Sequence, residues 1–390
     1  MILFEPTTII VCAVLILMGI ATPFVSIFFR KVRHIDEPTE STCPPVSIIL
    51  YAHDNARDLE RHLPAILEQD YPSPFEVIVV EGKSEDDTDD VLKKLKHQYA
   101  NLYTTFVPDS ARYMSRQKLA ITLGVKAAKN EWLLLTEPTC HPASHQWLLT
   151  MTRFCQPSTE LVVGYVTFND EASDYQHFER LLRQRYLLRE AQHGHPYRTE
   201  PGNLMFRKST FLEGRSFDGN LKFIRGEYDF IVNKFATATN TATATHSSSW
   251  IIDDAPTHKQ WTNYHLFYME TRKHLRNSLR HRLPIFIDHI AIHLPIILSL
   301  IVSLLITIFS FWKGILEETF GIAVLSSVVI SLLLTYILRT TIARRSMTRF
   351  GDTVPAWKVY PYEISIVWRF LYYKLRHRMA DRYDFISHKV

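Results

Sequence analysis

The sequence predicts an α/β fold with a mostly parallel sheet, combined with three membrane-spanning helices. Two observations support this prediction. Short β-rich runs alternate with helical segments between residues 46 and 136, a pattern typical of a parallel sheet covered by helices. Three other segments are apolar over about 20 residues, the length that crosses the ~30 Å of hydrocarbon in a bilayer.

The three apolar runs cover residues 9–29, 290–312 and 320–338. A cleaved signal peptide would begin with basic residues, but here Arg30, Lys31 and Arg33 follow the first run, which favours an uncleaved anchor. Basic residues mark the cytoplasmic side of a span, and they also precede the second run and follow the third. The sequence therefore predicts an outside N-terminus, with the middle segment and the C-terminal tail in the cytoplasm.

This pattern divides the chain into five predicted parts. They are an N-terminal transmembrane anchor (1–36), an α/β domain (44–255), a basic and aromatic interfacial linker (256–284), a transmembrane helical hairpin (285–339) and a cytoplasmic tail with an amphipathic helix (340–390).

The charge and the cysteines exclude several functional classes. The net charge of +4 is modest, and much of the basic excess lies beside the apolar runs, where anionic membrane lipids attract it. Nothing indicates a nucleic-acid partner. The four cysteines have no paired spacing, so neither a disulfide framework nor a CxxC metal site is predicted.

The elements follow in regular order along the chain. Strands are predicted over residues 46–52, 76–81, 102–107, 132–135, 160–167, 202–207 and 250–252. Helices are predicted over 56–69, 89–99, 115–129, 174–192 and 227–236. Residues 237–249 are predicted as a loop or extended edge. Residues 256–282 are predicted as an interfacial helix, and residues 360–378 as an interfacial helix or one packed on the domain.

The strand beginning at Trp132 ends in a polar turn with a carboxylate, Glu137, followed by Pro138. In open α/β sheets, ligands bind just beyond the carboxyl ends of the strands. Glu137 is therefore a candidate to meet a phosphate-bound metal or a sugar hydroxyl. The alternative is a surface loop that carries a single Glu.

Three blocks in this order resemble the family 2 glycosyltransferases of GT-A fold, of the membrane-anchored bacterial type. They are the strand and turn at 46–55, the Gln-Asp-Tyr-Pro at 69–72 and the strand with its acidic turn at 76–88. The resemblance covers about residues 44–255. It implies a nucleotide-diphosphate-sugar-transferase-like sheet with a cytoplasmic catalytic domain on the inner membrane.

In the family, the ends of the first two strands hold the nucleotide, which nominates Ala52, Asp54 and Glu81. Glu81 stands where the family usually has Asp. On the helix that follows Ser115, Lys118 is expected to face the donor diphosphate.

Glu137 and Thr139 fall on the family's Asp-x-Asp motif, which coordinates a divalent metal bound to the donor diphosphate. Mg²⁺ and Mn²⁺ prefer hard oxygen ligands, and only one carboxylate remains here. A metal held through Glu137, diphosphate and water, and weaker or absent metal dependence, are both compatible with this sequence.

The family's catalytic base is an acid that leads into a helix, which nominates Glu227 and Asp229. Apolar residues at the third to fifth places after Glu227 favour it over Asp229. Its role would be to take the proton from an acceptor hydroxyl. Asn203 and Arg207 resemble the acceptor-side strand and are expected to contact the sugar or diphosphate.

The resemblance implies a hexosyl- or N-acetylhexosaminyl-transferase that takes a nucleotide sugar and transfers the sugar, with inversion, to a lipid-linked or glycan acceptor. Two alternatives remain: a non-catalytic scaffold of a glycan assembly complex, and a processive polysaccharide synthase. The synthase is disfavoured because Trp261 lacks the preceding Arg of the Gln-x-x-Arg-Trp motif.

Overall fold

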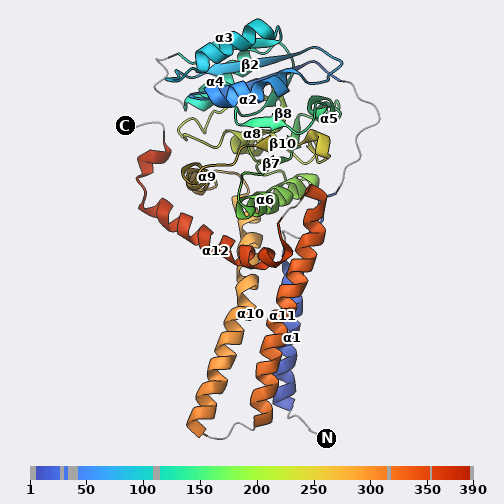
Figure 1. The fold of residues 1–390 in the computed structure, drawn as a ribbon, viewed down its shortest axis with the longest axis vertical. Helices are drawn as coiled ribbons and strands as arrows, with labels where there is room; N and C mark the ends of the chain where they lie inside the picture. The colour runs from blue at the N-terminus through green and yellow to red at the C-terminus, as the bar shows by residue number, and fades with distance from the viewer. Residues whose placement is uncertain are drawn as a thin grey trace. The chain divides into compact units, whose positions relative to one another are not determined.

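The computed structural model describes residues 6–26, 30–33, 43–108, 115–313, 318–351 and 354–386. The chain divides into two compact units (Figure 1). The larger unit contains Val32–Ser278 and Tyr372–Val390, and the smaller contains Met1–Lys31 and Leu279–Leu371. Each unit has its own core.

The main sheet of the larger unit has the strand order β3-β2-β1-β4-β8-β6-β9. Its strands are β1 (Val46–Ala52), β2 (Phe75–Glu81), β3 (Leu102–Phe106), β4 (Trp132–Leu135), β6 (Leu161–Gly164), β8 (Leu204–Arg207) and β9 (Thr241–Ala244). Neighbouring strands are parallel, except that β8 runs antiparallel to both β4 and β6. A second sheet has the order β5-β10-β7, from β5 (Cys140–Pro142), β10 (Ile251–Asp253) and β7 (Val166–Phe168).

Helices cover both faces of the first half of the sheet. On one face, α2 (Ala56–Leu67) and α3 (Thr88–Gln98) pack with the side chains of Ile48 and Val79 in one buried cluster. On the other face lies α4 (Arg116–Ala127), where a Cβ on Gly124 would meet Ile49 at 2.6 Å. Burial on both faces explains why β1 reads as a continuous apolar run.

The strand order creates a topological switch point between β1 and β4. From β1 the chain moves outward through β2 and β3, and then returns to place β4 on the other side of β1. Crevices at such switch points, beyond the carboxyl ends of the strands, are where open α/β sheets bind ligands. Asp54 and Glu137 follow the two strands that flank this point.

The second half of this unit supplies the remaining helices. They are α5 (Trp147–Thr152), α6 (Asp174–Gln192), α7 (Lys208–Glu213), α8 (Glu227–Phe235), α9 (His258–Thr271) and the short η1 (Ser247–Ser249) and η3 (Arg382–Phe385). Capping boxes fix the starts of α6, at Ser173, and α9, at Thr257.

The smaller unit holds α1 (Pro6–Val25), α11 (Glu318–Met347), η2 (Thr348–Phe350) and most of α10 (Ser278–Lys313) and α12 (Ala356–Met379). Among the described residues, three helices are long and apolar enough to cross a membrane. Gly19 lets α1 approach α11, because a Cβ there would meet the Ser331 carbonyl oxygen at 2.6 Å. Near one end of this unit, the buried Arg339 binds Glu363 through two hydrogen bonds of 2.9 and 3.0 Å.

The predicted fold class is confirmed, including the mostly parallel sheet and the three long apolar helices. Glu5 and Glu317, which support the predicted orientation, lie outside the described residues. The single strand predicted over 160–167 is wrong, since the chain forms β6 and β7 in different sheets. The short elements β5, α5 and α7 have no predicted counterpart, because three to six residues carry too little periodicity to recognise.

The segment for which the sequence predicts an interfacial helix forms α9, and its aromatic side chains are used within the domain. Trp261 and Met269 are buried. Tyr264 donates a hydrogen bond to the buried Glu200. The apolar face of α9 therefore completes the core of the larger unit.

Candidate active site

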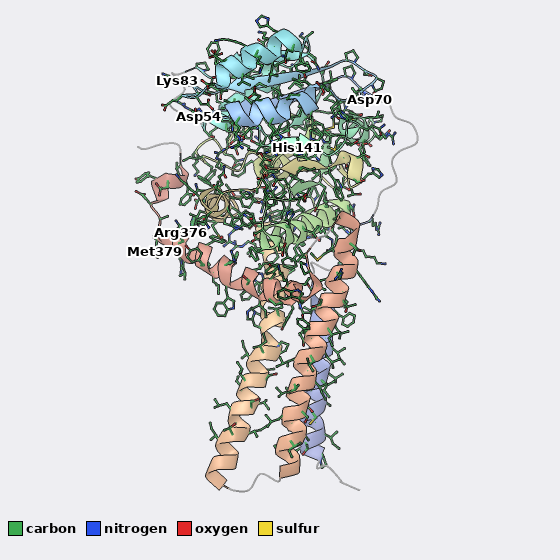
Figure 2. The ribbon with its side chains drawn as sticks, in the orientation of Figure 1. Asp54, Asp70, Lys83, His141, Arg376 and Met379 are labelled. Atoms are coloured by element: carbon green, nitrogen blue, oxygen red, sulfur yellow. The ribbon has the colours of Figure 1, made fainter. Side chains whose placement is uncertain are left out.

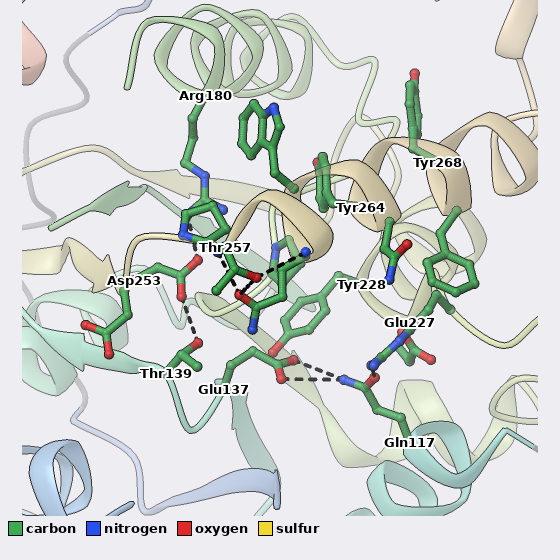
Figure 3. Close-up of a pocket in the computed structure, with 18 of the residues that line it drawn as sticks. Gln117, Glu137, Thr139, Arg180, Glu227, Tyr228, Asp253, Thr257, Tyr264 and Tyr268 are labelled. Atoms are coloured by element: carbon green, nitrogen blue, oxygen red, sulfur yellow. Dashed lines mark hydrogen bonds and ion pairs between the residues drawn. The ribbon is translucent and has the colours of Figure 1, made fainter. Parts of the chain in front are cut away.

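A cavity of about 630 Å³ lies beyond the carboxyl end of β4 (Figure 3). The turn after β4, the start of α8 and one side of α9 form much of its wall. Its lining includes Arg57, Arg61, Gln117, Glu137, Thr139, Arg180, Arg198, Arg225, Glu227, Tyr228, Asp229, Asp253, Asp254, Trp261, Tyr264 and Tyr268. Acidic, basic and aromatic groups thus face one space, at the switch point of the sheet.

Glu137 reaches the cavity because the chain turns sharply after β4. The Thr136 amide still donates to the Ile49 carbonyl of β1, and the Cys140 amide then closes the turn onto the Glu137 carbonyl at 3.0 Å. The Glu137 carboxylate accepts a hydrogen bond of 3.2 Å from the Gln117 side chain. Burial raises its pKa to about 7, and the nearby Tyr228 hydroxyl only partly offsets this effect. Glu137 can therefore change its protonation state near neutral pH.

Thr139 stands beside a carboxylate from another strand. Its hydroxyl donates to Asp253 of β10 at 2.8 Å. The other Asp253 oxygen accepts a hydrogen bond of 2.8 Å from Arg180 of α6, so this charge is neutralised within the wall. A carboxylate is thus present next to the position where the Asp-x-Asp pattern would place its second acid.

Glu227 begins α8, directly after Gly226, whose φ of +101° favours glycine. The side chain is 4% exposed and lies at the helix N-terminus, where the helix dipole stabilises a negative charge. The Lys118 amine is 3.6 Å from its carboxylate. Ser115 also approaches it, at 3.5 Å. The amine and the helix N-terminus both stabilise the carboxylate, which faces the cavity as a candidate proton acceptor.

Lys118 lies behind the cavity wall. The amine is completely buried and donates to the carbonyls of Phe223 and, at 3.4 Å, Arg225. Burial lowers the pKa of Lys118, while Glu227 opposes that change. Lys118 thus contacts Glu227 and the loop before α8, and it is not among the residues that line the cavity.

Asp229 faces a different environment, two residues further along α8. It accepts a hydrogen bond of 2.9 Å from Arg198, which also binds the Tyr264 hydroxyl at 2.9 Å. Burial raises the pKa of Asp229 to about 6 in spite of Arg198. Glu200 completes this cluster through two hydrogen bonds from Arg183. Because its carboxylate is already engaged with a guanidinium, Asp229 is less free than Glu227 to take a proton.

The predicted nucleotide residues form a separate corner of the same edge. Ala52 and Glu81 are direct partners at the ends of β1 and β2. Asp54 accepts a hydrogen bond of 2.7 Å from the Glu85 amide, and it lies near Lys83 beside α2 and α3 (Figure 2). These three residues lie outside the cavity lining, although β1 is the immediate neighbour of β4.

The Tyr51 side chain interacts electrostatically with both this corner and the cavity wall. A Cβ on Gly82 would come within 2.6 Å of the Tyr51 hydroxyl, so this position has room only for glycine. Burial raises the pKa of Tyr51, which is also influenced by Asp54 on one side and by Arg225 and Glu227 on the other. The corner and the cavity are therefore close enough to interact electrostatically.

The two predicted acceptor-side residues do not reach the cavity. Asn203 is fully buried and uses its amide to join Trp147, Tyr165 and Ser249. Arg207 pairs with Trp132, at the amino end of β4, and its guanidinium binds the Thr159 carbonyl. The antiparallel direction of β8 carries Arg207 to the opposite edge of the sheet. Asn203 lies near the end of β4, but its amide is engaged inside the core.

The sequence reasoning missed much of the cavity wall. Gln117, Arg225, Tyr228, Arg180, Arg198 and Asp253 all line it. One signal was available, since Asp253 follows a short predicted strand just as Glu137 does. The arginines gave no such signal, because an Arg-rich helix is more often solvent-exposed than turned toward a cavity.

Comparison with known proteins identifies the domain that contains this site. Residues 47–211 match the family model described as glycosyl transferase family 2. These residues form a domain of glycosyl transferase family 2. The match includes β1, the turn with Glu137 and β8, while the segment with Glu227 and Asp253 follows it.

One relative by sequence and one solved structure illustrate the range of similarity. Glycosyltransferase AglE of Haloferax volcanii is 28% identical over 131 residues, which cover 33% of this chain and 41% of that protein. The alignment thus spans less than half of this curated relative. A mannosyltransferase of Pyrobaculum calidifontis, solved with GDP-Man and Mn²⁺, has a TM-score of 0.53 at 13% identity and covers 95% of this chain and 98% of its own. That likeness concerns the fold.

The residues of this family 2 domain allow a divalent metal at the turn after β4, with few protein ligands. Glu137 offers one carboxylate that faces the cavity. Thr139 donates its hydroxyl to Asp253, and Arg180 engages Asp253 from the other side. The donor set therefore fits an ion held by Glu137 together with diphosphate oxygens and water. Such an ion would neutralise charge on a departing diphosphate.

Proposed function

We propose that the protein is a membrane-anchored glycosyltransferase that moves a sugar from a nucleotide-diphosphate donor to a hydroxyl of a lipid-linked or glycan acceptor. The observation that carries this proposal is the arrangement of Glu137 and Glu227 on one cavity at the switch point of a family 2 domain. Gln117 joins them, because it donates to Glu137 and accepts from Arg225, the residue before Gly226.

The donor would lie across the edge formed by β1, β2 and β4. The nucleoside is proposed to occupy the corner with Ala52, Asp54 and Glu81, and the diphosphate to extend toward Glu137 and Arg225. The sugar then lies in the 630 Å³ cavity, a volume within the usual range of small-molecule sites. Aromatic side chains of α9, such as Tyr264 and Tyr268, line the far side.

The reaction proposed is a single displacement with inversion. The acceptor oxygen attacks the anomeric carbon, the bond from that carbon to the diphosphate oxygen breaks, and Glu227 takes the acceptor proton. Lys118 and the α8 N-terminus stabilise the carboxylate of Glu227 before the transfer. Arg225 is placed to meet the negative charge of the leaving diphosphate.

The location proposed is the inner membrane of a bacterial cell, with the transferase domain in the cytoplasm. Its support is the three helices that are long and apolar enough to span a membrane, together with the basic residues that flank them. A cytoplasmic domain on the membrane has access both to nucleotide sugars and to lipid-linked acceptors.

A non-catalytic scaffold is the second candidate function. Thr139 stands where a second metal-binding acid is expected, and the Lys118 amine lies 3.6 Å from Glu227. Both features are compatible with a site that no longer turns over. A processive synthase has less support, since Trp261 is part of the cavity wall without the preceding Arg of the polymerase motif.

Calorimetry of the full chain in detergent tests the proposal. GDP-, UDP- and dTDP-sugars are titrated with and without Mn²⁺, and one of them is expected to bind. That donor, radiolabelled, is then incubated with membranes to detect transfer. Glu131→Gln changes a carboxylate directly before β4, at the end away from the cavity. This control variant should bind the donor and transfer its sugar as the wild type does. Donor binding without transfer would favour the scaffold, and no binding of any nucleotide sugar would refute both the donor site and the enzyme.

A further inference from the structure

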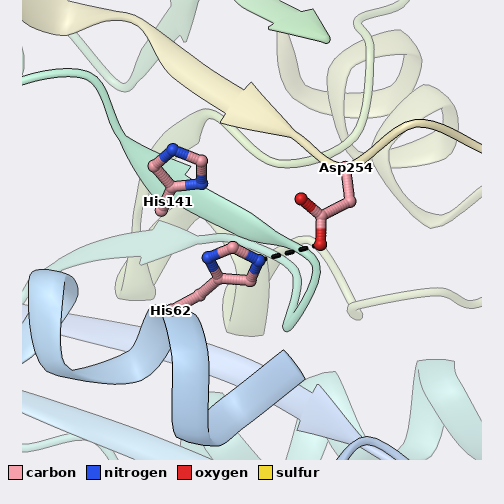
Figure 4. Close-up of side chains that lie close together, drawn as sticks. All are labelled: His62, His141 and Asp254. Carbon is pink, nitrogen blue, oxygen red and sulfur yellow. Dashed lines mark hydrogen bonds and ion pairs between the residues drawn. The ribbon is translucent and has the colours of Figure 1, made fainter. Parts of the chain in front are cut away.

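Three metal-ligating side chains converge on one side of the turn that carries Glu137. His62 comes from α2, His141 from β5, and Asp254 directly follows β10. One potential ligand atom from each of them lies within 4.8 Å of the other two. Figure 4 shows that the two rings and the carboxylate face a common space. The sequence distance between these residues is large, so the fold itself assembles the group.

Binding an ion would require a local rearrangement of these side chains. The His62 Nε2 atom lies 2.8 Å from an Asp254 oxygen, and the two imidazole rings lie 4.8 Å apart in nearly parallel planes. Ligands about 2.0–2.2 Å from a tetrahedral ion are roughly 3.4 Å apart. To reach that spacing, the rings would have to turn out of their parallel stack and the His62–Asp254 contact would have to widen.

The surroundings of the cluster also suit a metal. The buried Nδ1 of His141 has no hydrogen-bond partner among the described residues, an arrangement that is costly unless something else binds this ring. The second Asp254 oxygen accepts a hydrogen bond of 3.0 Å from Asn169, which fixes the carboxylate as outer partners do in metal sites. His62 is 3% exposed, whereas His141 and Asp254 are partly exposed, and Arg61 lies 3.9 Å from the Asp254 carboxylate.

We propose that His62, His141 and Asp254 bind one divalent transition-metal ion of the zinc class. Imidazole nitrogens with one carboxylate suit Zn²⁺, whereas Mg²⁺ prefers ligand sets made of oxygen alone. This ion is distinct from one at Glu137, which would depend on the donor diphosphate.

The consequence of such an ion is a link between α2 and the second sheet. Asp254 also donates its backbone amide to the Thr139 carbonyl at 3.0 Å. An ion at this point would therefore hold α2, β5 and β10 together directly behind the Glu137–Thr139 turn. It would stabilise the shape of the cavity without touching the sugar.

Zinc binding by the full chain in detergent, after removal of metals with a chelator, tests this inference. Zn²⁺ is titrated in competition with a chromophoric chelator and without nucleotide, and the Co²⁺ form is examined by visible absorption. One equivalent of Zn²⁺ and a four-coordinate Co²⁺ spectrum are expected. His141→Ala should weaken Zn²⁺ binding at least about 100-fold, because outer partners alone contribute about 10–100-fold.

Controls separate this site from others. His145→Ala removes a nearby exposed histidine and should leave Zn²⁺ affinity unchanged, as should Glu137→Gln. If His141→Ala fails to fold, Asp254→Asn and His62→Gln provide the same readout from two other elements. Wild-type affinity in a folded variant of any one ligand, or the absence of a one-equivalent site in the wild type, would overturn the proposal. Because nucleotide is absent, this outcome is independent of the proposed transferase activity.

Discussion

Two groups of carboxylates surround the cavity, and they differ in what neutralises them. In the arginine cluster, every carboxylate binds a guanidinium; its members are Arg180, Arg183, Arg198, Glu200, Asp229 and Asp253. In the acidic pair, Glu137 is bound by the Gln117 amide, and Glu227 lies near the Lys118 amine. In the arginine cluster, carboxylates and guanidinium groups thus neutralise one another. The two carboxylates of the acidic pair face the cavity and have no guanidinium bound to them among the described residues, so they can interact with a ligand there.

The same side chain behaves in opposite ways in these two places. Burial tends to raise the pKa of Glu200, but Arg183 and Arg198 outweigh it and hold that pKa at about 2. Burial also acts on Glu137, where no guanidinium binds the carboxylate directly, and its pKa rises to about 7. Neighbours, more than burial, therefore decide which carboxylate is structural and which is available for chemistry or metal binding.

The substitution Glu227→Gln removes the proposed base and should have the largest effect. We expect kcat to fall by about 10²–10⁴-fold, the usual contribution of a positioned general base. The dissociation constant of the donor should remain nearly unchanged, because the amide keeps the size of the side chain. Single-turnover kinetics together with calorimetry measure the two quantities separately.

The matched control for this experiment is Asp229→Asn, on the same helix. Its carboxylate is engaged with Arg198, so this change should affect stability more than the chemical step. If Asp229→Asn lowers kcat by the larger factor, the base is Asp229, and the distinction drawn between the acidic pair and the arginine cluster fails.

Breaking the arginine cluster should reduce stability. Arg198→Met removes the hydrogen bonds to Asp229 and Tyr264 and leaves buried carboxylates with less compensation. Loss of one partner of a buried pair costs about 3–5 kcal/mol, which should appear as a lower thermal midpoint of the detergent-solubilised protein. Arg57→Met, an exposed residue on the same cavity, is the control, with an expected change within about 0.5 kcal/mol. Equal effects of the two changes would mean that the cluster adds no stability.

Local sequence patterns predicted the strands and the turn with Glu137, whereas the arginines of the arginine cluster left no such signal. Regular alternation of strands and helices revealed β1 to β4, and a strand that stops at a carboxylate revealed Glu137. Glu227 was nominated, together with Asp229, by the resemblance to the family's acid before a helix. The strand and turn signals are local, because a period or a cap involves residues within a few positions of one another.

The remaining parts of the site depend on contacts between distant segments. Arg198 binds Asp229, and Thr139 binds Asp253, 114 positions away. Such pairs leave no trace in local periodicity. The positions of Arg207 and Lys118 also depend on such contacts. Arg207 lies at the edge of the sheet opposite the cavity because β8 is antiparallel to β4. The Lys118 amine is covered by the loop before α8.

The raised pKa of Glu137 should be visible in the pH dependence of the protein's stability. Its folded pKa of about 7 lies above the ordinary value of 4.5, so the folded state holds this proton more tightly than the unfolded state. The protein therefore loses stability as pH rises from about 4.5 to 7, and the full cost remains above that range. The cost is at most about 3.5 kcal/mol, since a pKa difference of one corresponds to about 1.4 kcal/mol.

The variant Glu137→Gln lacks this cost. Its thermal midpoint relative to the wild type should rise between pH 5 and 8, while at pH 4 the two proteins should differ little on this account. Mn²⁺-dependent donor binding should show the complementary trend: in the wild type it strengthens as Glu137 loses its proton, and in the variant it does not. If the difference in thermal midpoint between the variant and the wild type is constant across pH, the pKa of Glu137 is not raised in the folded protein.

A smaller effect is expected from the C-terminal segment, which supports the acidic pair and not the arginine cluster. The Ile224 amide donates to the Phe385 carbonyl at 3.1 Å, and Phe223 forms a β-bridge with Ile386. On its other side, the same loop receives hydrogen bonds from Lys118 and Ser115. The segment thus backs the loop that leads into Glu227.

Ending the chain after Met379 removes that support, and we expect kcat to fall about threefold with little change in donor affinity. A threefold loss corresponds to well under 1 kcal/mol, because the loop keeps its bonds to α4. Deletion of residues 387–390 alone is the control and should leave kcat unchanged. These hydrogen bonds do not involve the arginine cluster. The thermal midpoint of the truncated protein should therefore fall less than that of Arg198→Met. A truncated protein with unchanged kcat would show that Lys118 and Ser115 hold the loop by themselves.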